Sequence, residues 1–326
     1  MPARGLLYRV PCSRTGLTFF PVNDINNQQM PDVSICIPAY LAERYLPETL
    51  KSVREQTFCR WELIVIEDGS QDGAEELVRQ FARDVSQHVS FQRHAHNRGL
   101  PATRNTAISQ ARAKIIALLD ADDYWEFDHL ESIMAVLAKP GADLAHSGSI
   151  LFDSDSRRTL EFRTPSPEQV RDFPHSLFVA DYVIQPASVA LTKELWKRVG
   201  GFDESYRYVE DREMWMRCAR SGARFQFTGK NTCFYRKHAA ALSTHGAEMA
   251  IASARVYEQH LDWPEIPKTL RVAKASNAWV AAARILQRAE PRRASELLLR
   301  AQRIEPTFSR LLWAAALRLY SYPKGK

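Results

Sequence analysis

From Val33 onwards the chain alternates short apolar segments with longer segments whose apolar residues recur at helical spacing. The short segments read as strands because they are apolar and stop at turn residues. Strands are predicted at 33–38, 61–67, 89–94 and 113–120, with helices between them at 44–56, 72–85 and 100–111. Strands that alternate with helices form βαβ units, so the pattern predicts an α/β fold with a mainly parallel sheet flanked by helices.

Three of these predicted strands run into polar residues at their carboxyl ends. The first ends in Pro38, Ala39 and Tyr40, the second in the turn 67–70, and the fourth in the acidic stretch 120–123. A single polar strand end would mean little, because loops are polar in general. Ligands of open α/β sheets bind beyond the carboxyl ends of the strands, however, so three such ends at one edge predict a binding site there.

The acidic stretch places three carboxylates, those of Asp120, Asp122 and Asp123, directly after an apolar strand. Like charges this close repel and raise one another's pKa unless a cation joins them. Asp120 and Asp122 alternate, so they can share a divalent cation such as Mg²⁺ or Mn²⁺, which prefers oxygen ligands. A cation with so few protein ligands usually takes phosphate oxygens and water as well, and the stretch therefore predicts a diphosphate substrate.

Other classes of phosphate-handling enzyme lack their signatures in this sequence. Neither a GxxxxGK[ST] loop nor a GxGxxG fingerprint occurs, so a P-loop nucleotidase and a nicotinamide enzyme have no support. Phosphatases of the haloacid dehalogenase type also carry alternating aspartates after a strand, but near the start of the domain. Here the aspartates follow the fourth strand, which disfavours that class.

The second half of the chain loses the regular alternation and ends in a basic tail. The formal net charge of +6 is uneven, because residues 264–326 carry +9 and the remainder carries −3. A mildly acidic body argues against a nucleic-acid-binding surface across the protein. The further predicted elements are strands at 143–153, 223–227 and 232–238, a strand and helix within 182–203, and helices at 210–222, 271–289, 292–304 and 307–320.

The last of these segments, 307–320, is apolar with two arginines, and two interpretations stay open. It can lie at the surface of an anionic membrane as an interfacial helix, which predicts peripheral membrane contact. Alternatively its apolar face packs on the catalytic domain or on a partner subunit, which is the commoner fate of an amphipathic helix.

The cysteines and the N-terminal segment suggest a cellular location. The five cysteines are odd in number and widely spaced, so neither a zinc site nor a disulfide framework is predicted. That usage is typical of a reducing compartment. No apolar run reaches the length of about 18 residues that a membrane span needs, and residues 1–31 read as a loose leader without a signal-peptide core. We therefore expect a cytoplasmic protein.

Four ordered motifs, "VSICIPAYLAERYLPETLKSVREQTFCRWELIVIEDGSQDG", "NRGLPATRN", "LLDADDYW" and "EDREMWMRCARSG", resemble those of family 2 glycosyltransferases of the GT-A fold. The resemblance covers about residues 32–245, which would be the GT-A domain, and leaves 246–326 as a basic helical extension. It implies inverting transfer of one sugar from a nucleotide-diphosphate sugar, expected to be a UDP-sugar, to a glycan or lipid-linked acceptor of cell-surface polysaccharide biosynthesis. The QxxRW motif and membrane spans of processive relatives are absent.

The resemblance also implies roles for individual residues. Asp122 and His238 would ligate Mn²⁺ or Mg²⁺, Asp123 would cap the next helix or orient its neighbours, and Arg236 would meet the diphosphate. Ser243 belongs to the same motif segment as His238. The residues implied to bind the nucleotide sugar are Pro38, Ala39, Tyr40, Glu43, Asp68, Asn97, Gly99, Arg104, Asp120 and Ala121.

The implied general base is Asp211, with Gln185, Ser188 and Glu210 on the acceptor side. Inverting transfer needs one carboxylate to take the proton of the attacking hydroxyl. A purely structural interpretation remains, because acidic residues are common in the first turn of a helix. Two other functions also stay open: a nucleotidyltransferase, although 38–45 lacks the glycine-rich loop of that class, and a catalytically silent sugar-nucleotide-binding protein.

Overall fold

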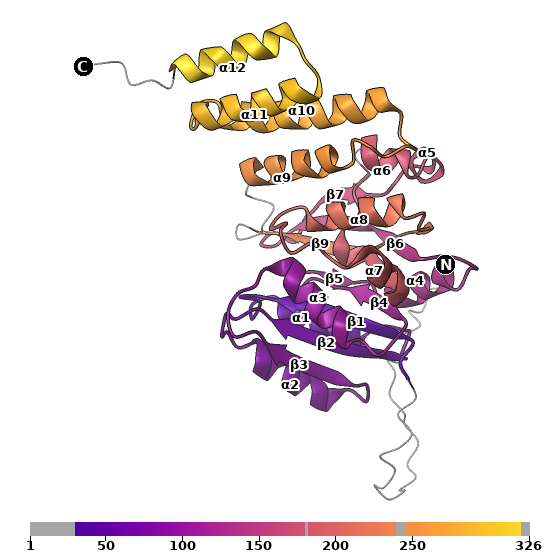
Figure 1. The fold of residues 1–326 in the computed structure, drawn as a ribbon. Coiled ribbons are helices and arrows are strands. Elements are labelled where there is room, and N and C mark those ends of the chain that lie inside the picture. Colours follow the sequence, from indigo (N-terminus) through magenta and orange to yellow (C-terminus); the bar gives the residue numbers. More distant parts are fainter. Residues whose placement is uncertain (1–29, 180–181, 239–245, 321–326) are drawn as a thin grey trace, which may run out of the picture. The chain divides into compact units, whose positions relative to one another are not determined.

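The computed structural model describes residues 30–179, 182–238 and 246–320, which fold as two compact units (Figure 1). Of the described residues, the first unit comprises 30–164, 184–198 and 224–236, and the second comprises 165–179, 182–183, 199–223, 237–238 and 246–320. The chain thus passes between the units several times instead of filling one after the other. The ranges 32–245 and 246–326 given for the two domains stay a prediction. Each unit is described by itself.

The first unit is built on a sheet of nine strands within the described residues. Its order is β3–β2–β1–β4–β8–β6–β9–β5, and β7 pairs with β6. Strands β3, β2, β1 and β4 are parallel, as predicted. These four strands are β1 Val33–Ala39, β2 Trp61–Glu67, β3 Val89–Arg93 and β4 Ile115–Leu118.

The remaining strands continue the sheet with antiparallel pairings. The predicted α/β fold with a helix-flanked sheet is therefore confirmed. The parallel part of the sheet ends at β4, after which strands and helices no longer alternate regularly along the sequence. The two strands predicted at 223–227 and 232–238 form one strand, β9, that continues through Gly229. These strands are β5 Tyr124–Trp125, β6 Leu144–Asp153, β7 Thr159–Arg163, β8 Val189–Thr192 and β9 Phe225–Lys237.

The core of the first unit explains why β1 and β2 are apolar throughout. Val33, Ile35 and Ile37 alternate along β1 and pack in one cluster with apolar side chains of α1, α2 and α4. Alternate residues of a strand point to opposite faces, so Cys36 points to the other face, and α3 contacts β1 and β2 without joining that cluster. Helices of this unit are α1 Leu46–Arg54, α2 Ala74–Asp84, α3 Leu100–Gln110, α4 His129–Leu137, the 3₁₀ turn η1 Pro186–Ser188 and α7 Lys193–Val199.

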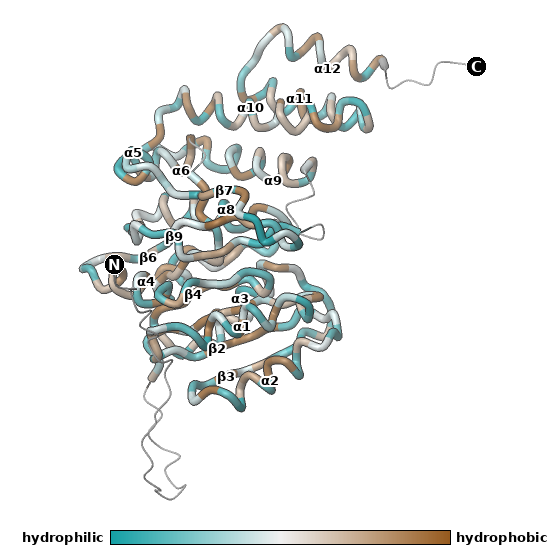
Figure 2. The backbone as a smooth tube through the Cα atoms, turned by 180° about the vertical axis from the view of Figure 1, so that it is seen from behind, coloured by the Kyte–Doolittle hydropathy of each residue, from teal (hydrophilic) through white to brown (hydrophobic). Residues whose placement is uncertain are grey.

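The described part of the second unit is helical and includes the predicted C-terminal extension. Trp279, Leu286 and Leu298 belong to a core that joins its last four helices. Figure 2 shows hydrophobic and hydrophilic residues interspersed along these helices, as expected of amphipathic elements. They are α5 Pro167–Arg171, α6 His175–Val179, α8 Glu210–Arg220, α9 Gly246–Gln259, α10 Lys268–Leu286, α11 Pro291–Ile304 and α12 Phe308–Tyr320.

Two findings bear on the expectations drawn from cysteines and hydropathy. Cys59 is disulfide-bonded, which its spacing in the sequence did not predict, and its partner lies outside the described residues. Cys36, Cys218 and Cys233 are free thiols. Among the helices that the structure describes, none combines the length and the apolar character that crossing a bilayer requires.

Candidate functional site

The polar ends of β1, β2 and β4 lie next to one another in the first unit. Ala39 is paired with Glu67 in the β1–β2 register, and the N–H of Asp68 donates to the Ala39 carbonyl oxygen at 2.8 Å. On the other side of β1, the N–H of Leu119 donates to the carbonyl oxygen of Cys36 at 3.1 Å. The residues that follow these three strands therefore share one edge of the sheet.

The loop after β1 is tied to the loop after β2. The N–H of Leu41 donates to the Ser70 hydroxyl at 3.1 Å, and the carboxylate of Glu43 accepts from the N–H of Gly73 at 3.2 Å. Glu43 therefore joins the two loops in this structure. Tyr40 is 52% exposed, so its ring is accessible to a ligand, whereas Ala39 is buried within β1.

Glu67 shapes the turn that follows β2. Its buried carboxylate accepts from the N–H of Ser70 at 2.6 Å, from the N–H of Gly69 at 3.2 Å and from Nε of Arg93 at 2.7 Å. Burial raises the pKa of this carboxyl, but the Ser70 and Arg93 hydrogen bonds outweigh it and hold the pKa below its ordinary value. Glu67 thus stays ionised and fixes the turn that presents Asp68.

Asp68 holds the loop 94–99 against the end of β2. Its buried carboxylate accepts from the N–H of Arg98 at 2.9 Å and the N–H of Gly99 at 2.8 Å, and lies 2.7 Å from Nδ1 of His94. Gly99 adopts a φ of +92°, a conformation that glycine tolerates best. Asn97 lies exposed in the same loop. Two backbone N–H groups and the ring of His94 thus already contact this carboxylate. The predicted contact of Asp68 with a nucleotide base stays a prediction.

His94 was not among the predicted site residues. Its Nδ1 faces Asp68 and its Nε2 lies 3.1 Å from the hydroxyl of Thr106, so the ring links the loop to α3. The signal was available, because His94 follows the third strand directly. Gly69, in the turn after β2, lies close to the loop 94–99. A Cβ on it would lie 2.7 Å from the carbonyl carbon of His96, so a larger residue would push the turn and the loop apart.

The acidic stretch 120–123 follows β4 and carries buried charge. Nη2 of Arg104, which is buried in α3, donates to Asp120 at 2.7 Å. Asp123 is 1% exposed, and its Oδ1 accepts from the N–H of Arg236 at 2.8 Å. Burial, and next the charges of Asp122 and Asp120, raise the pKa of Asp123 well above its ordinary value. The three carboxylates are therefore close enough to repel one another.

The chemistry of this stretch fits a divalent cation. No hydrogen-bond partner reaches Oδ2 of Asp123 from the described residues, so one buried oxygen of the loop is left without a donor. The described residues contain no group of three or more His, Cys, Asp or Glu side chains that could hold a metal unaided. A cation here would thus be held by Asp122, Asp120 and ligands from a bound diphosphate, which is the usual arrangement for Mg²⁺ with phosphates.

The expectation that Asp123 caps the following helix is wrong. The next element is β5, and α4 begins only after Asp128. The buried carboxylate of Asp123 instead accepts a hydrogen bond from the backbone N–H of Arg236 in β9. This contact orients the acidic stretch. Ala121 is buried in the same stretch.

Gln185 precedes the 3₁₀ turn before β8, and Ser188 is the last residue of that turn. The hydroxyl of Ser188 donates to the carbonyl oxygen of Gln185 at 2.7 Å, and both side chains are buried. Within that turn, the carbonyl oxygen of Ala187 accepts from the indole N–H of Trp125 at 2.6 Å. These contacts stabilise the turn, and a role of the two residues in acceptor binding stays a prediction.

Glu210, Asp211 and His238 belong to the second unit. Glu210 and Asp211 open α8, where negative charge is favoured by the helix dipole. Glu210 is buried, whereas Asp211 is half-buried and accepts from the N–H of Arg212 at 2.7 Å. His238 follows the last residue of β9 and is half-buried. Ser243 lies outside the described residues.

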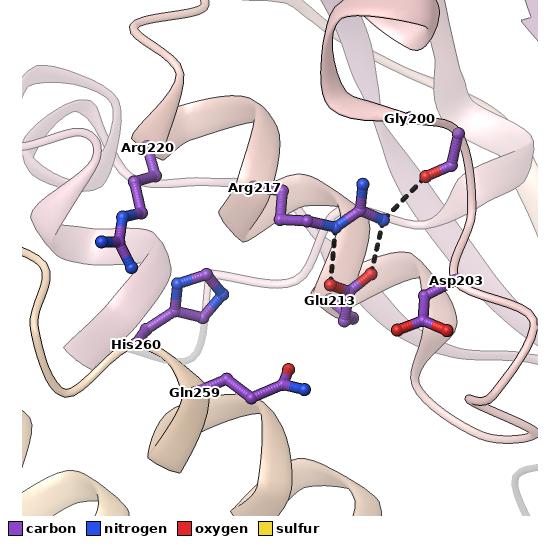
Figure 3. Close-up of a pocket in the computed structure, with 8 residues that line it drawn as sticks. Gly200, Asp203, Glu213, Arg217, Arg220, Gln259 and His260 are labelled. Carbon is purple, nitrogen blue, oxygen red and sulfur yellow. Dashed lines mark hydrogen bonds and ion pairs between the residues drawn. The ribbon is translucent and has the colours of Figure 1, made fainter.

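A cavity of about 650 Å³ in the second unit borders α8 (Figure 3). Glu213, Arg217 and Arg220 recur at helical spacing along its wall. Arg217 donates to Glu213 at 2.6 Å and to the carbonyl oxygen of Gly201 at 2.7 Å, so this pair holds the turn after α7. Burial lowers the pKa of the neighbouring His260 to about 4. None of the predicted site residues lines this cavity.

A search against known families and curated proteins identifies relatives by sequence. A model described as "Glycosyl transferase family 2" matches residues 34–183. TuaG of Bacillus subtilis, whose name places it in teichuronic acid biosynthesis as a glycosyltransferase, is 32% identical over 38% of this chain and 49% of its own. WfgD of Escherichia coli, named a UDP-Glc:alpha-D-GlcNAc-diphosphoundecaprenol beta-1,3-glucosyltransferase, is 30% identical over 38% of this chain and 48% of its own. The match thus spans about half the length of these relatives.

Solved structures share the fold at low sequence identity. Staphylococcus aureus TarS 1–349 in complex with UDP-GlcNAc aligns with a TM-score of 0.62 at 17% identity, over 90% of this chain and 93% of that one. The mannosyltransferase PcManGT of Pyrobaculum calidifontis, in complex with GDP-Man and Mn²⁺, aligns with a TM-score of 0.59 at 20% identity, over 89% of this chain and 85% of that one. This likeness shows the fold alone.

Proposed function

We propose, on the premise that residues 34–183 match the model of glycosyl transferase family 2, that the chain is an inverting, metal-dependent glycosyltransferase. It moves one sugar from a nucleotide-diphosphate donor to an acceptor hydroxyl. The observation that carries the proposal is the acidic stretch 120–123, which follows β4 beside the ends of β1 and β2 and brings three carboxyl groups together, so that burial and the charges of Asp122 and Asp120 raise the pKa of Asp123. UDP is the proposed nucleotide, as in the complex of TarS with UDP-GlcNAc.

The chemistry divides between two sets of carboxylates. The acceptor oxygen forms a bond to the anomeric carbon while the bond from that carbon to the diphosphate breaks. Asp211 accepts the proton of the attacking hydroxyl, as a general base must. Asp122, with Asp120 beside it, holds Mn²⁺ or Mg²⁺. The cation supplies positive charge that offsets the charge developing on the departing diphosphate.

A nucleotide screen tests the proposal directly. With Mn²⁺ present, UDP at about 100 times its Kd should raise the Tm by several degrees, on the order of 5 °C, because a ligand that binds only the folded state stabilises it. GDP and ADP should raise the Tm less. Stabilisation by GDP alone would contradict the choice of base. Release of pyrophosphate from UTP and a sugar 1-phosphate, instead of UDP from a UDP-sugar, would favour the nucleotidyltransferase alternative.

We propose a lipid-linked or glycan acceptor at the inner face of the cell membrane, reached by a cytoplasmic enzyme. The name of the relative WfgD specifies an acceptor on diphosphoundecaprenol. In this chain α12 offers a surface for membrane contact. Trp313, Ala314 and Leu317 pack on the core that α9, α10 and α11 form, so one face of the helix packs within the C-terminal extension. The other face exposes Phe308 (76%), Leu311 (47%), Leu312 (55%) and Leu319 (73%).

A flotation experiment tests the membrane contact. The exposed apolar face of α12 and the charge of +9 on residues 264–326 should bring the protein to vesicles that contain anionic lipid, and less so to neutral ones. Leu312→Glu should reduce flotation because it places a charge on that face. Ala289→Glu, which adds the same charge at an exposed position outside α12, is the matched control. Equal recovery with anionic and neutral vesicles would contradict the contact.

A further inference from the structure

The acidic stretch 120–123 is held by its backbone carbonyl groups as well as by its carboxylates. The hydroxyl of Thr49, in α1, lies 2.9 Å from the carbonyl oxygen of Ala121 and 2.7 Å from that of Asp123. Nε of Arg236, in β9, donates at 2.6 Å to the carbonyl oxygen between them, that of Asp122. Side chains from two elements far apart in the sequence thus fix three successive peptide groups of the loop that carries Asp122.

Arg236 is bound to this part of the fold from several sides. Its backbone N–H donates to Asp123 at 2.8 Å, and its guanidinium group forms an ion pair with Glu48. The guanidinium carbon lies 4.8 Å from the ring centroids of both Tyr45 and Phe152, within the range of cation–π contact. Arg236 is only 3% exposed, so its side chain supports the acidic stretch from inside the fold. It is not placed to make the contact with a diphosphate that the resemblance implied.

Glu48, which precedes Thr49 in α1, holds the guanidinium group of Arg236 in place. Its carboxylate also accepts from Arg157, at 3.0 Å from Nη1 and 2.7 Å from Nη2. The carboxylate therefore balances two guanidinium groups and keeps that of Arg236 directed at the Asp122 carbonyl oxygen. An arginine can meet a carboxylate and a carbonyl group at once because its donors form a rigid fork, which lysine lacks.

We propose that Thr49 and Arg236 are positioning residues that direct the Asp122 carboxylate toward the cation and so set the cation affinity of the acidic stretch. Neither residue touches the cation or the donor. Residues that orient a metal ligand from outside commonly change metal affinity by about 10–100-fold when they are replaced. The inference rests on the proposed metal-dependent function. It adds Thr49, to which the sequence motifs gave no role, and gives Arg236 a role other than the implied contact with the diphosphate.

Mn²⁺ binding to the full chain in the presence of UDP, measured by titration with electron paramagnetic resonance, tests the inference without an activity assay. Thr49→Val keeps the shape of the side chain but removes its hydroxyl, so the Kd for Mn²⁺ should rise about tenfold. Thr49→Ser restores the hydroxyl and should return the Kd to within about threefold of the parent. Arg236→Lys should also raise the Kd, because lysine cannot hold Asp122 and Glu48 together.

Ser52→Ala is the matched control. Ser52 is one turn further along α1, and its buried hydroxyl donates to the carbonyl oxygen of Thr49 at 2.7 Å without reaching the acidic stretch. It should lower the Tm without changing the Kd for Mn²⁺. If Thr49→Val folds and binds Mn²⁺ within twofold of the parent, the positioning role is overturned while the proposed function stands. If the parent itself binds no Mn²⁺ with UDP, the proposed metal dependence fails, and the inference fails with it.

Discussion

Replacing Asp211 by asparagine should lower the rate of sugar transfer by about 10²–10⁴-fold, the usual contribution of a general base. Asparagine has nearly the same shape as aspartate but cannot take the proton of the attacking hydroxyl. Asp211 is half-buried in the first turn of α8, where a neutral side chain is also tolerated. The expected result is therefore a loss of turnover in a folded protein, measured as kcat with the donor identified by the nucleotide screen.

Two further measurements separate catalysis from folding and binding. The Kd for UDP with Mn²⁺ should stay within about twofold of the parent, since no step of nucleotide binding is assigned to Asp211. Asp262→Asn is the matched control, because Asp262 belongs to the same unit and forms an exposed ion pair with Arg220. It should leave kcat unchanged. Transfer by Asp211→Asn at more than a tenth of the parent rate would overturn the assignment of the base.

The two central parallel strands β1 and β2 could be predicted from the sequence because they are buried on both faces. Such strands are continuously apolar, and β1 and β2 carry seven buried residues each. The strand β7 was not predicted because it is mostly exposed. It lies off the main path of the sheet, pairs with β6, and has four exposed residues out of five, so it lacks a continuous apolar run. At two residues, β5 is too short to show any periodicity.

The position of the site could be predicted, but not the contacts of its members. Strand topology places Asp68 and the acidic stretch at one edge, and that requires only the order of strands. A residue type fixes how many hydrogen bonds a side chain can make, but not which partners it finds. Asp68 bonds to donors in the loop 94–99, and Arg236 bonds to a carbonyl oxygen 114 residues away. Only the folded chain shows these partners.

Replacing Asp122 by alanine should remove most of the metal-dependent activity and weaken Mn²⁺ binding in the presence of UDP by at least about 100-fold. A cation at a departing diphosphate contributes several kcal/mol to the rate, and each 1.36 kcal/mol is a factor of about ten. Titration of Mn²⁺ with UDP present, together with activity at each Mn²⁺ concentration, measures both effects. Asp84→Ala is the control, because Asp84 is a half-exposed carboxylate of the same unit that pairs with Arg54.

Thermal stability distinguishes loss of a metal ligand from loss of structure at Asp122. The charge of Asp122 acts on the buried Asp123 and helps to raise its pKa, so it is a source of repulsion in the folded protein without metal. Removing that charge should leave the Tm unchanged or raise it, because the repulsion disappears. A weaker Mn²⁺ affinity with an undiminished Tm can then only reflect a lost ligand. Unchanged metal-dependent activity in Asp122→Ala would mean that the cation binds elsewhere, and a large fall in Tm would mean that Asp122 supports the loop instead.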